Sequence, residues 1–399
     1  MKVAIWLSND MIPTKGGGAS YYKTLINGID NYSFDPSIEI VYVTYRNDKR
    51  NNNLNRQIIE LYPNVFMMLL FEIPRRFFDF IESISWKDKM EFLRNKYYIN
   101  QKLKKQNVDI IYYIQPTCKI QDFPFIVQNW DLSFHSMYSF PEVINNYAFK
   151  VWNRFYTHYL KKAFCVFSES EAGKEELVRY LNIEPQKIHV IPIFPNASLL
   201  NANADLKVLE KFNLAKDNFF FYPAQFWAHK NHYNLLRAFQ KLKNIAPSFK
   251  LVFTGSDKGN LKYIKELITE FDLDDDVKIT GFVSENQLKA LYENAAALVM
   301  PTFLGPTNMP LLEAYSLGCK VICSDFKGHR EQLGEDALYF QPNDYNDILS
   351  KMCEIVEKDT SSLKIGDSAR SNYFTLENAL FQINKNLLEI SNIKMCWKA

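Results

Sequence analysis

The chain has 399 residues, which exceeds the length over which one hydrophobic core usually keeps growing and therefore predicts two domains. Hydrophobic residues make up 47% and charged residues 23%, a balance typical of a soluble globular protein. The formal net charge of +2 argues against a dedicated nucleic-acid-binding protein, so we expect no nucleic-acid partner.

The start of the chain, MKVAIWLSND, lacks the basic region, long apolar core and cleavage site of a secretion signal. No apolar run approaches the ~20 residues of a membrane-spanning helix. The six cysteines form no close CxxC pair, which favours free thiols in a reducing compartment and disfavours a structural zinc site. These features predict a cytoplasmic protein.

Residues 75–105 carry nine basic and four acidic residues with aromatic residues between them. One interpretation is a solvated helical face over the core. The alternative is a surface that lies against anionic lipid at the inner face of a membrane, or against an anionic acceptor.

The first half of the chain alternates short apolar runs with helical patterns. KVAIWLS predicts a strand, the glycines at 16–18 a turn, and the following residues a helix. Alternating strands and helices predict a parallel sheet covered on both faces. Further strands are expected at 38–45, 108–115, 123–131, 163–170 and 187–194, with a helix at 171–182.

The second half repeats this α/β pattern after a Pro- and Asn-rich interruption. Five strands, at 219–226, 250–255, 277–283, 296–302 and 320–325, predict a second doubly wound domain, and 378–391 predicts an amphipathic helix. The expected division is a first domain at 1–195, a linker at 196–205, a second domain at 206–370 and a helical segment at 371–399.

The segment GPTNMPLLEAYSLG, residues 305–318, follows a predicted strand, where doubly wound sheets bind their ligands. Pro310 suits the first helical position, and Thr307 or Asn308 could supply the N-cap oxygen. We expect a helix start with free N–H groups that favour phosphate, and Glu313 one turn later could bind a ribose diol. The alternative is a capped helix with a solvated glutamate.

Three further positions suggest a binding site. Lys230 precedes a helix start, where a cation is disfavoured, so we expect it to reach towards an anion. The glycines at 16–18 would admit a phosphate, although the motif is equally consistent with a plain turn. His135 is either a packed side chain or a group that bonds a sugar hydroxyl or positions an acceptor. His229 and His232 lack carboxylate or Cys partners, so no metal site is predicted.

Several motifs, in order and each after a strand, carry a family resemblance. FFYPAQFWAHKNHYNLLRAF, KITGFVSENQLKALYENAAALVMPTFLGPTNMPLLEAYSLGCKVICSD and HREQLGEDALYFQPND resemble the carboxyl domain of glycosyltransferase family 4. The amino half agrees more loosely, through KGGGASYY, NWDLSFHSMYSFPE and AFCVFSESEAGKEELVRYLNIEPQKIHVIP. The resemblance implies the GT-B fold, with two Rossmann-like domains facing a cleft and a last helix that crosses back to the first domain.

The resemblance also implies a site. The carboxyl domain would bind a nucleotide sugar, the amino domain would bind a glycan or lipid-linked acceptor, and no metal or other cofactor would be needed. The implied catalytic residues are Lys230 at the diphosphate, Glu313 at the ribose and His135 near the transferred sugar. The implied donor-binding residues are Gly17, Gly18, Gln225, Lys230, Gly255, Phe282, Val283, Thr307, Asn308, Met309, Leu311 and Glu313, with Asn308, Met309 and Leu311 acting through backbone amides.

Two positions depart from the family pattern. Gln225 stands where the family commonly has Arg, and Gly305 stands where it commonly has the first of two Glu residues, so Thr307 or Asn308 is expected to stand in. We predict a retaining glycosyltransferase that moves a hexose or deoxyhexose from a nucleotide diphosphate to a glycan or lipid-linked glycan, in surface polysaccharide synthesis such as that of O-antigen or capsule. The alternative is a catalytically silent partner that binds nucleotide sugar or glycan for another transferase.

Overall fold

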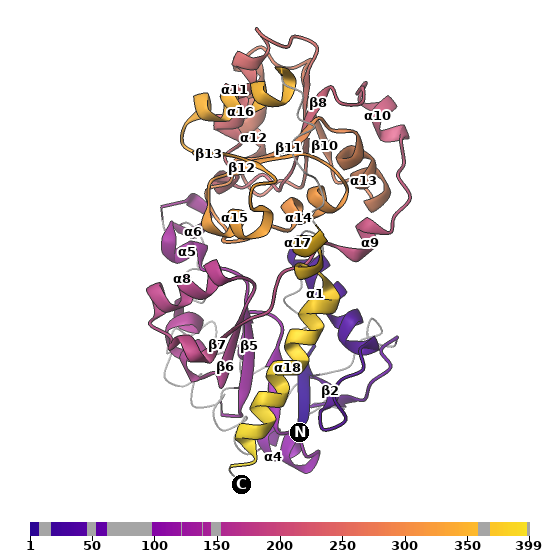
Figure 1. The fold of residues 1–399 in the computed structure, drawn as a ribbon. Coiled ribbons are helices and arrows are strands. Elements are labelled where there is room, and N and C mark those ends of the chain that lie inside the picture. Colours follow the sequence, from indigo (N-terminus) through magenta and orange to yellow (C-terminus); the bar gives the residue numbers. More distant parts are fainter. Residues whose placement is uncertain are drawn as a thin grey trace.

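The chain folds around two parallel β-sheets that lie one above the other in Figure 1. The computed structural model describes residues 1–7, 17–45, 53–61, 98–120, 122–137, 139–144, 153–357 and 368–396. Within these ranges the alternation of strands and helices confirms the prediction of two doubly wound units.

The first sheet has the strand order β3-β2-β1-β4-β5-β6-β7. Its strand order reverses between β1 and β4, which is where ligands bind in this type of sheet. The strand β3 was not predicted, because it has only three residues. The strands are β1 (Lys2–Trp6), β2 (Glu39–Thr44), β3 (Ile58–Glu60), β4 (Ile110–Tyr113), β5 (Phe125–Asn129), β6 (Cys165–Ser168) and β7 (Ile188–Val190).

Helices cover both faces of the first sheet. Helix α1 packs on one face, whereas α4, η3 and α8 contribute to the hydrophobic cluster on the other. The described helices of this half are α1 (Gly17–Asn31), α4 (Asn100–Lys105), α5 (Ser133–Ser136), α6 (Pro141–Ile144), η3 (Phe155–Tyr159), η4 (Leu160–Lys162), α8 (Glu171–Leu181) and η5 (Pro185–Lys187).

The second sheet has the order β10-β9-β8-β11-β12-β13. It contains six strands within the described residues, so the prediction of five missed the short β13. The strands are β8 (Phe219–Pro223), β9 (Lys250–Thr254), β10 (Val277–Gly281), β11 (Ala297–Met300), β12 (Val321–Ser324) and β13 (Leu338–Phe340). The helices are α10 (Lys207–Lys211), η6 (Ala228–Lys230), α11 (His232–Leu242), α12 (Leu261–Glu270), α13 (Glu285–Asn294), α14 (Met309–Ser316), α15 (Lys327–Leu333) and α16 (Tyr345–Glu357).

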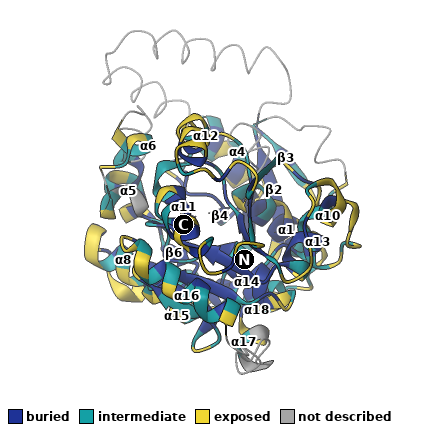
Figure 2. Ribbon diagram, turned by 90° about the horizontal axis from the view of Figure 1, so that it is seen from above, coloured by how far each residue is buried: buried dark blue, intermediate teal, exposed yellow. Residues whose placement is uncertain are grey.

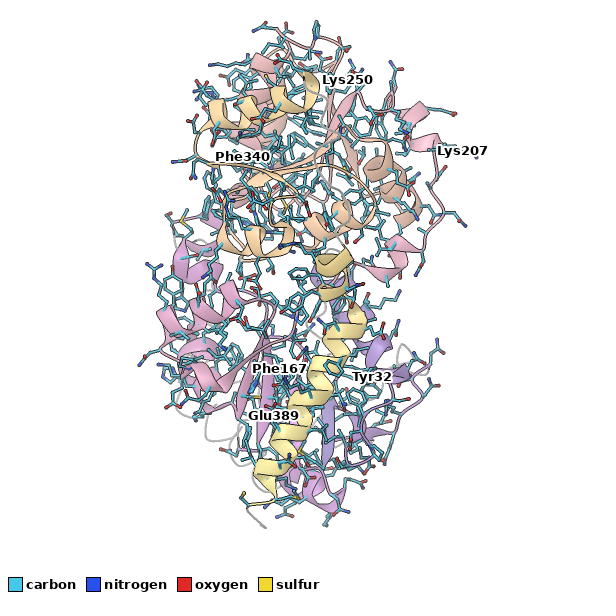
Figure 3. All side chains as sticks on the ribbon, viewed as in Figure 1. Tyr32, Phe167, Lys207, Lys250, Phe340 and Glu389 are labelled. Carbon is cyan, nitrogen blue, oxygen red and sulfur yellow. The ribbon has the colours of Figure 1, made fainter. Side chains whose placement is uncertain are left out.

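The last helix crosses back to the first sheet, as predicted. After α17 (Ser368–Tyr373), α18 (Leu376–Lys394) runs along the first domain beside α1. Leu380, Ile383 and Leu387 of α18 are buried in the same cluster as β1 and β6. Figure 3 accordingly places Glu389 of α18 in the same domain as Phe167, far from Lys250 and Phe340.

The predicted linker lies between β7 and β8 and contains the short helix α9 (Ala197–Leu200), whose N-cap is Asn196. The predicted domain boundaries remain predictions. In Figure 2 the buried strands occupy the centre, and the exposed residues lie on the outer sides of the helices. No helix in the described part of the chain is both long enough and apolar enough to span a membrane.

Candidate functional site between the two domains

The carboxyl ends of both sheets border a cavity of about 610 Å³. One wall comes from the first domain, including α1 and the residues after β5 and β6, and the other comes from the second domain. Eleven predicted site residues line the cavity: Gly17, Gly18, Gln225, Lys230, Gly255, Phe282, Val283, Thr307, Asn308, Met309 and Glu313. The structure therefore brings together positions that are up to 296 residues apart in the sequence.

Lys230 supplies a partly buried cation to this cavity. Its ammonium forms no ion pair with a described residue, and it lies 3.5 Å from Oδ1 of Asn308. Burial lowers its pKa to about 8, although the nearby charges of Asp131 and Glu142 oppose that effect. An anionic ligand beside Lys230 would therefore offset the cost of burying this charge.

Hydrogen bonds hold the turn that carries Lys230 on several sides. The Tyr222 hydroxyl donates to the Lys230 carbonyl at 2.9 Å. Asn231 adopts a left-handed conformation with φ 59° and donates to the carbonyls of Pro301 and Pro342 at 2.8 and 2.6 Å. These bonds fix the backbone on both sides of the lysine.

The start of α14 differs from the expectation of free amides. Asn308 is the N-cap residue, but its side chain makes no capping bond. Its amide donates to Oε1 of Gln332 at 2.9 Å, and the Leu311 amide donates to the Asn308 carbonyl at 3.3 Å. The prediction that these two amides are free is therefore wrong, and Met309 is the one of the three whose amide has no acceptor among the described residues.

The loop before α14 explains the departure at Gly305. Its φ of 103° is disfavoured for any residue with a side chain, so a glutamate would be strained there. A Cβ at this position would also lie 3.2 Å from Nδ2 of Asn308. The carboxamide of Asn308 therefore lies next to the place where the side chain of a glutamate at position 305 would begin.

Glu313 lies at the cavity wall with 8% of its surface exposed. The Tyr292 hydroxyl donates to Oε2 of Glu313 at 2.9 Å. Burial raises the pKa of Glu313 to about 7, against the opposing hydrogen bonds from Tyr292 and the backbone of Asn196. The side chain of Asn196 in turn donates to Glu285 at 3.1 Å, so the linker is bonded to two carboxyl groups of the second domain.

The wall from the first domain contains residues that sequence reasoning did not assign to the site. Asp131 follows β5 and Glu169 follows β6, and both line the cavity. Glu169 is only 2% exposed, and burial raises its pKa well above the usual range. Their positions directly after strands were the signal that could have identified them.

Two predicted residues do not line the cavity. Leu311 is fully buried in the core of the second domain. His135 is half-buried on α5 with its ring edge-on to Tyr156, and burial lowers its pKa. The predicted contact of His135 with the transferred sugar therefore gains no support from its position, whereas Trp130 and Asp131 of the same loop do reach the cavity.

Residues 75–97 of the predicted membrane-facing segment 75–105 lie outside the described part of the chain. Its described part includes α4, where Leu103 is buried and Lys102 donates to the Leu61 carbonyl at 3.1 Å. Lys104 and Lys105 are exposed.

Comparison with known proteins identifies the second domain. Residues 207–372 match the family model described as glycosyl transferases group 1. The similarity to this family thus lies in the second domain. The recognition from sequence is thus confirmed for the group, whereas assignment to family 4 and retention of configuration stay predictions.

Curated relatives match over about half of their length. The O-antigen chain mannosyltransferase B of Escherichia coli is 24% identical over 204 residues, which cover 50% of this chain and 54% of the relative. An N-acetylgalactosaminyltransferase of Campylobacter jejuni, which acts on N-acetylgalactosamine-N,N'-diacetylbacillosaminyl-diphospho-undecaprenol, is 31% identical over 202 residues, covering 50% and 52%.

Solved structures match over nearly the whole chain. Sucrose-phosphate synthase from Thermosynechococcus elongatus has a TM-score of 0.72 at 17% identity, covering 98% of this chain and 99% of that chain. At this identity the likeness concerns the fold, and it confirms the predicted GT-B arrangement of two Rossmann-like domains.

Proposed function

We propose that this protein is a retaining glycosyltransferase of family 4 that moves a hexose or deoxyhexose from a nucleotide-diphosphate sugar to a glycan or lipid-linked glycan. The observation that carries this proposal is Lys230, a partly buried cation without a described ion-pair partner, in the lining of an interdomain cavity. A leaving diphosphate is the charge that such a group stabilises.

The two walls of the cavity suit the two substrates. On the second-domain wall, Glu313 can accept hydrogen bonds from a ribose, and Phe282 and Val283 can border the base. The wall from the first domain carries the Asp131 carboxylate, which disfavours phosphate, whereas burial keeps Glu169 neutral. We therefore place the donor on the second domain and the acceptor on the first.

The transfer step in this proposal needs no enzymic nucleophile. The bond from the anomeric carbon to the diphosphate oxygen breaks while the bond to the acceptor oxygen forms on the same face. The acceptor proton passes to the departing diphosphate, whose charge Lys230 stabilises. We expect no metal requirement, so an excess of EDTA should leave the rate unchanged.

The product class is inferred from the relatives. An O-antigen mannosyltransferase and a transferase acting on an undecaprenol-linked glycan both match the chain. We infer a role in bacterial surface polysaccharide synthesis on a lipid-linked acceptor. Contact of residues 75–105 with an anionic membrane surface, and a location at the inner face of the membrane, belong to the same proposal.

A two-stage experiment tests the function. Thermal shift with a panel that includes UDP-glucose, UDP-N-acetylgalactosamine and GDP-mannose identifies the donor, because ligand binding raises the melting temperature by mass action. Lys230→Ala should then weaken transfer by about 1.5–3 kcal/mol, or roughly 10- to 100-fold, while the fold is retained. Unchanged kinetics of this variant would remove Lys230 from the site.

The catalytically silent alternative is motivated by Gln225, an uncharged residue at a cavity position where the family commonly carries Arg. The side-chain oxygen of Gln225, Oε1, already accepts from the Trp227 ring N–H at 3.1 Å. A protein that binds a donor but releases no nucleoside diphosphate, with any acceptor or by hydrolysis, would favour this alternative.

A further inference from the structure

The ring of His329 is fixed in one tautomer. It is fully buried, and its Nδ1 lies 2.8 Å from the carbonyl oxygen of Ser324. A carbonyl can only accept a hydrogen bond, so Nδ1 must carry the proton. Burial lowers the pKa of His329 to about 4, which keeps the ring neutral and leaves Nε2 as an acceptor at neutral pH.

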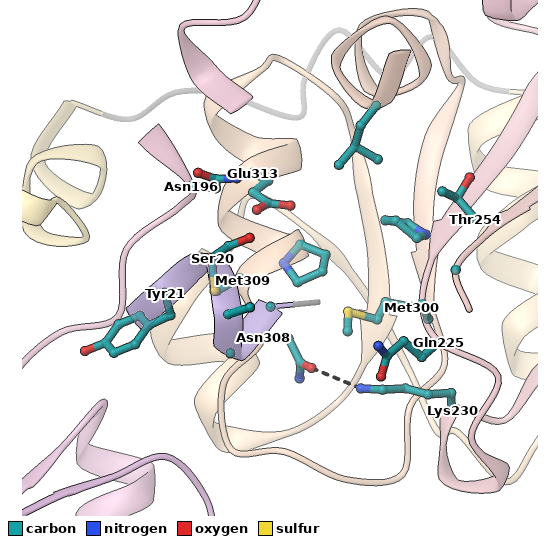
Figure 4. A pocket seen from close by; sticks show the side chains of 18 of the residues that line it. Ser20, Tyr21, Asn196, Gln225, Lys230, Thr254, Met300, Asn308, Met309 and Glu313 are labelled. Atoms are coloured by element: carbon teal, nitrogen blue, oxygen red, sulfur yellow. Dashed lines mark hydrogen bonds between the residues drawn. The ribbon is translucent and has the colours of Figure 1, made fainter. Parts of the chain in front are cut away.

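The tautomer determines which way the Asn308 carboxamide points. Nδ2 of Asn308 lies 2.9 Å from Nε2 of His329, and only the NH₂ group can donate to that nitrogen. The carboxamide oxygen consequently points the other way, where it lies 3.5 Å from Nζ of Lys230, as Figure 4 shows. A reversed carboxamide would turn its NH₂ group towards the ammonium.

The backbone around Asn308 leaves little other freedom. The Gln332 side chain accepts from the Asn308 amide at 2.9 Å and donates to its carbonyl at 3.0 Å. Gln332 belongs to α15, and this helix also approaches the loop before α14 closely at Gly328. A Cβ on Gly328 would lie 1.5 Å from the Pro306 carbonyl oxygen. Because the backbone of Asn308 is held, its side chain can change only by rotation, and the bond to the His329 ring fixes that rotation.

We propose that His329 is a positioning residue for anion binding: it orients Asn308 so that the carboxamide oxygen faces Lys230 and holds the ammonium towards the cavity. The identity of the anion as the diphosphate of a sugar donor rests on the proposed function. Asp131 and Glu142 are the charged groups that act on Lys230, and the rings of His229 and His232 lie close enough to be affected by its charge. None of these four residues contacts Asn308 through a described hydrogen bond.

A double-mutant cycle with UDP and GDP as probes tests the proposal. His329→Leu should weaken the affinity for the bound probe about tenfold in the native background, but less than about twofold when Asn308 is already alanine. His232→Leu is the matched control, because His232 is equally buried and neutral but lies outside the cavity lining. An equal loss in both backgrounds, or no loss in either, would overturn the proposal.

A purely structural role for His329 would change melting temperature but not the titration of Lys230. His329→Leu should shift the alkaline limit of probe binding to lower pH, since the ammonium loses an oriented acceptor. His329→Gln, which keeps one donor and one acceptor, should restore most of the affinity. If the alkaline limit of probe binding in His329→Leu stayed at the pH seen in the native protein, the proposal would be contradicted.

The tautomer can be measured without a variant or a ligand. In ¹⁵N-histidine-labelled protein, long-range ¹H–¹⁵N correlation should show His329 protonated on Nδ1, and protonation on Nε2 would overturn the inference. If the native protein bound neither UDP nor GDP, the proposed function would fail, and this measurement would still decide the orientation of Asn308.

Discussion

The backbone amide of His229 donates a hydrogen bond to Oε1 of Glu142 at 3.0 Å, and the His229 ring contacts the same carboxylate. Glu142 belongs to α6 of the first domain, whereas His229 directly precedes Lys230 in the second. Burial raises the pKa of Glu142, but the bonds from His229 outweigh it and lower the pKa, so the group is ionised at neutral pH. The Glu142 carboxylate thus links the two domains next to the Lys230 ammonium.

Glu142→Ala should loosen the two domains, because the His229 amide loses a charged acceptor. Losing such a bond costs about 1.5–3 kcal/mol. We expect a larger radius of gyration by small-angle scattering and a slower transfer rate. Glu184→Ala, an exposed glutamate of the same domain, is the control. An unchanged scattering profile together with an unchanged rate would contradict the role of Glu142.

The affinity for a nucleoside diphosphate should be greatest between about pH 7 and pH 8. Glu313 has its pKa raised to about 7, so the ionised carboxylate that accepts from a ribose predominates above that pH. Lys230 has its pKa lowered to about 8, so the ammonium is lost above it. Titration calorimetry with UDP and GDP across this range measures the profile.

Single variants assign the two limits of that profile. Glu313→Gln should remove the rise near pH 7 and leave the decline near pH 8, whereas Lys230→Met should remove the decline. The terminal phosphate of the probe titrates near pH ~6, below both groups. A profile that is flat from pH 6.5 to about 9 would show that neither group contacts the ligand.

Gly305→Ala should reduce both stability and probe affinity. The left-handed backbone costs about 1–2 kcal/mol for a residue with a Cβ, and the added methyl group crowds Asn308. Gly259→Ala is a matched control, because Gly259 has the same φ of 103° but nothing within 4 Å of its Cβ position. Equal effects of the two substitutions on UDP and GDP affinity would show that the contact with Asn308 is unimportant.

Leu387→Ala should destabilise the first domain, although the residue lies near the end of the chain. Leu387 is fully buried against the first sheet, and such truncations cost about 2–5 kcal/mol. Urea unfolding measures the change. Leu206→Ala, at a side chain that is 55% exposed, should change stability by less than about 0.5 kcal/mol. Equal stabilities of the two variants would argue against α18 as part of that core.

The alternation of strands and helices was predictable because its signal is local. Apolar runs such as 219–226 and helices such as 171–182 are specified by residues close in sequence. The strands β3 and β13 were missed because three residues give too short a pattern. The helix α18 was predicted from its amphipathic pattern, and its return to the first domain came from the family resemblance.

The sequence could predict the site only through residues that directly follow a strand, because those positions meet at one edge of a parallel sheet. Lys230, Asn308 and Glu313 reach the cavity because backbone topology brings their strand ends together. The direction of a side chain is set by packing, and α5 holds His135 away from the lining. The backbone amide of Asn308 bonds Gln332, which is 24 residues away, and its carboxamide bonds His329, which is 21 residues away. No local sequence pattern reveals contacts over such separations.

The placement of α18 has a consequence for dividing the protein. Because the final helix belongs to the same hydrophobic cluster as α1 and the first sheet, a fragment that stops at the linker would lose the buried side chains of Leu380, Ile383 and Leu387 from that core. The hydrophobic core of the amino-terminal half is therefore completed only by the carboxyl-terminal helix. It depends on residues that leave the ribosome only after the whole second sheet has been synthesised.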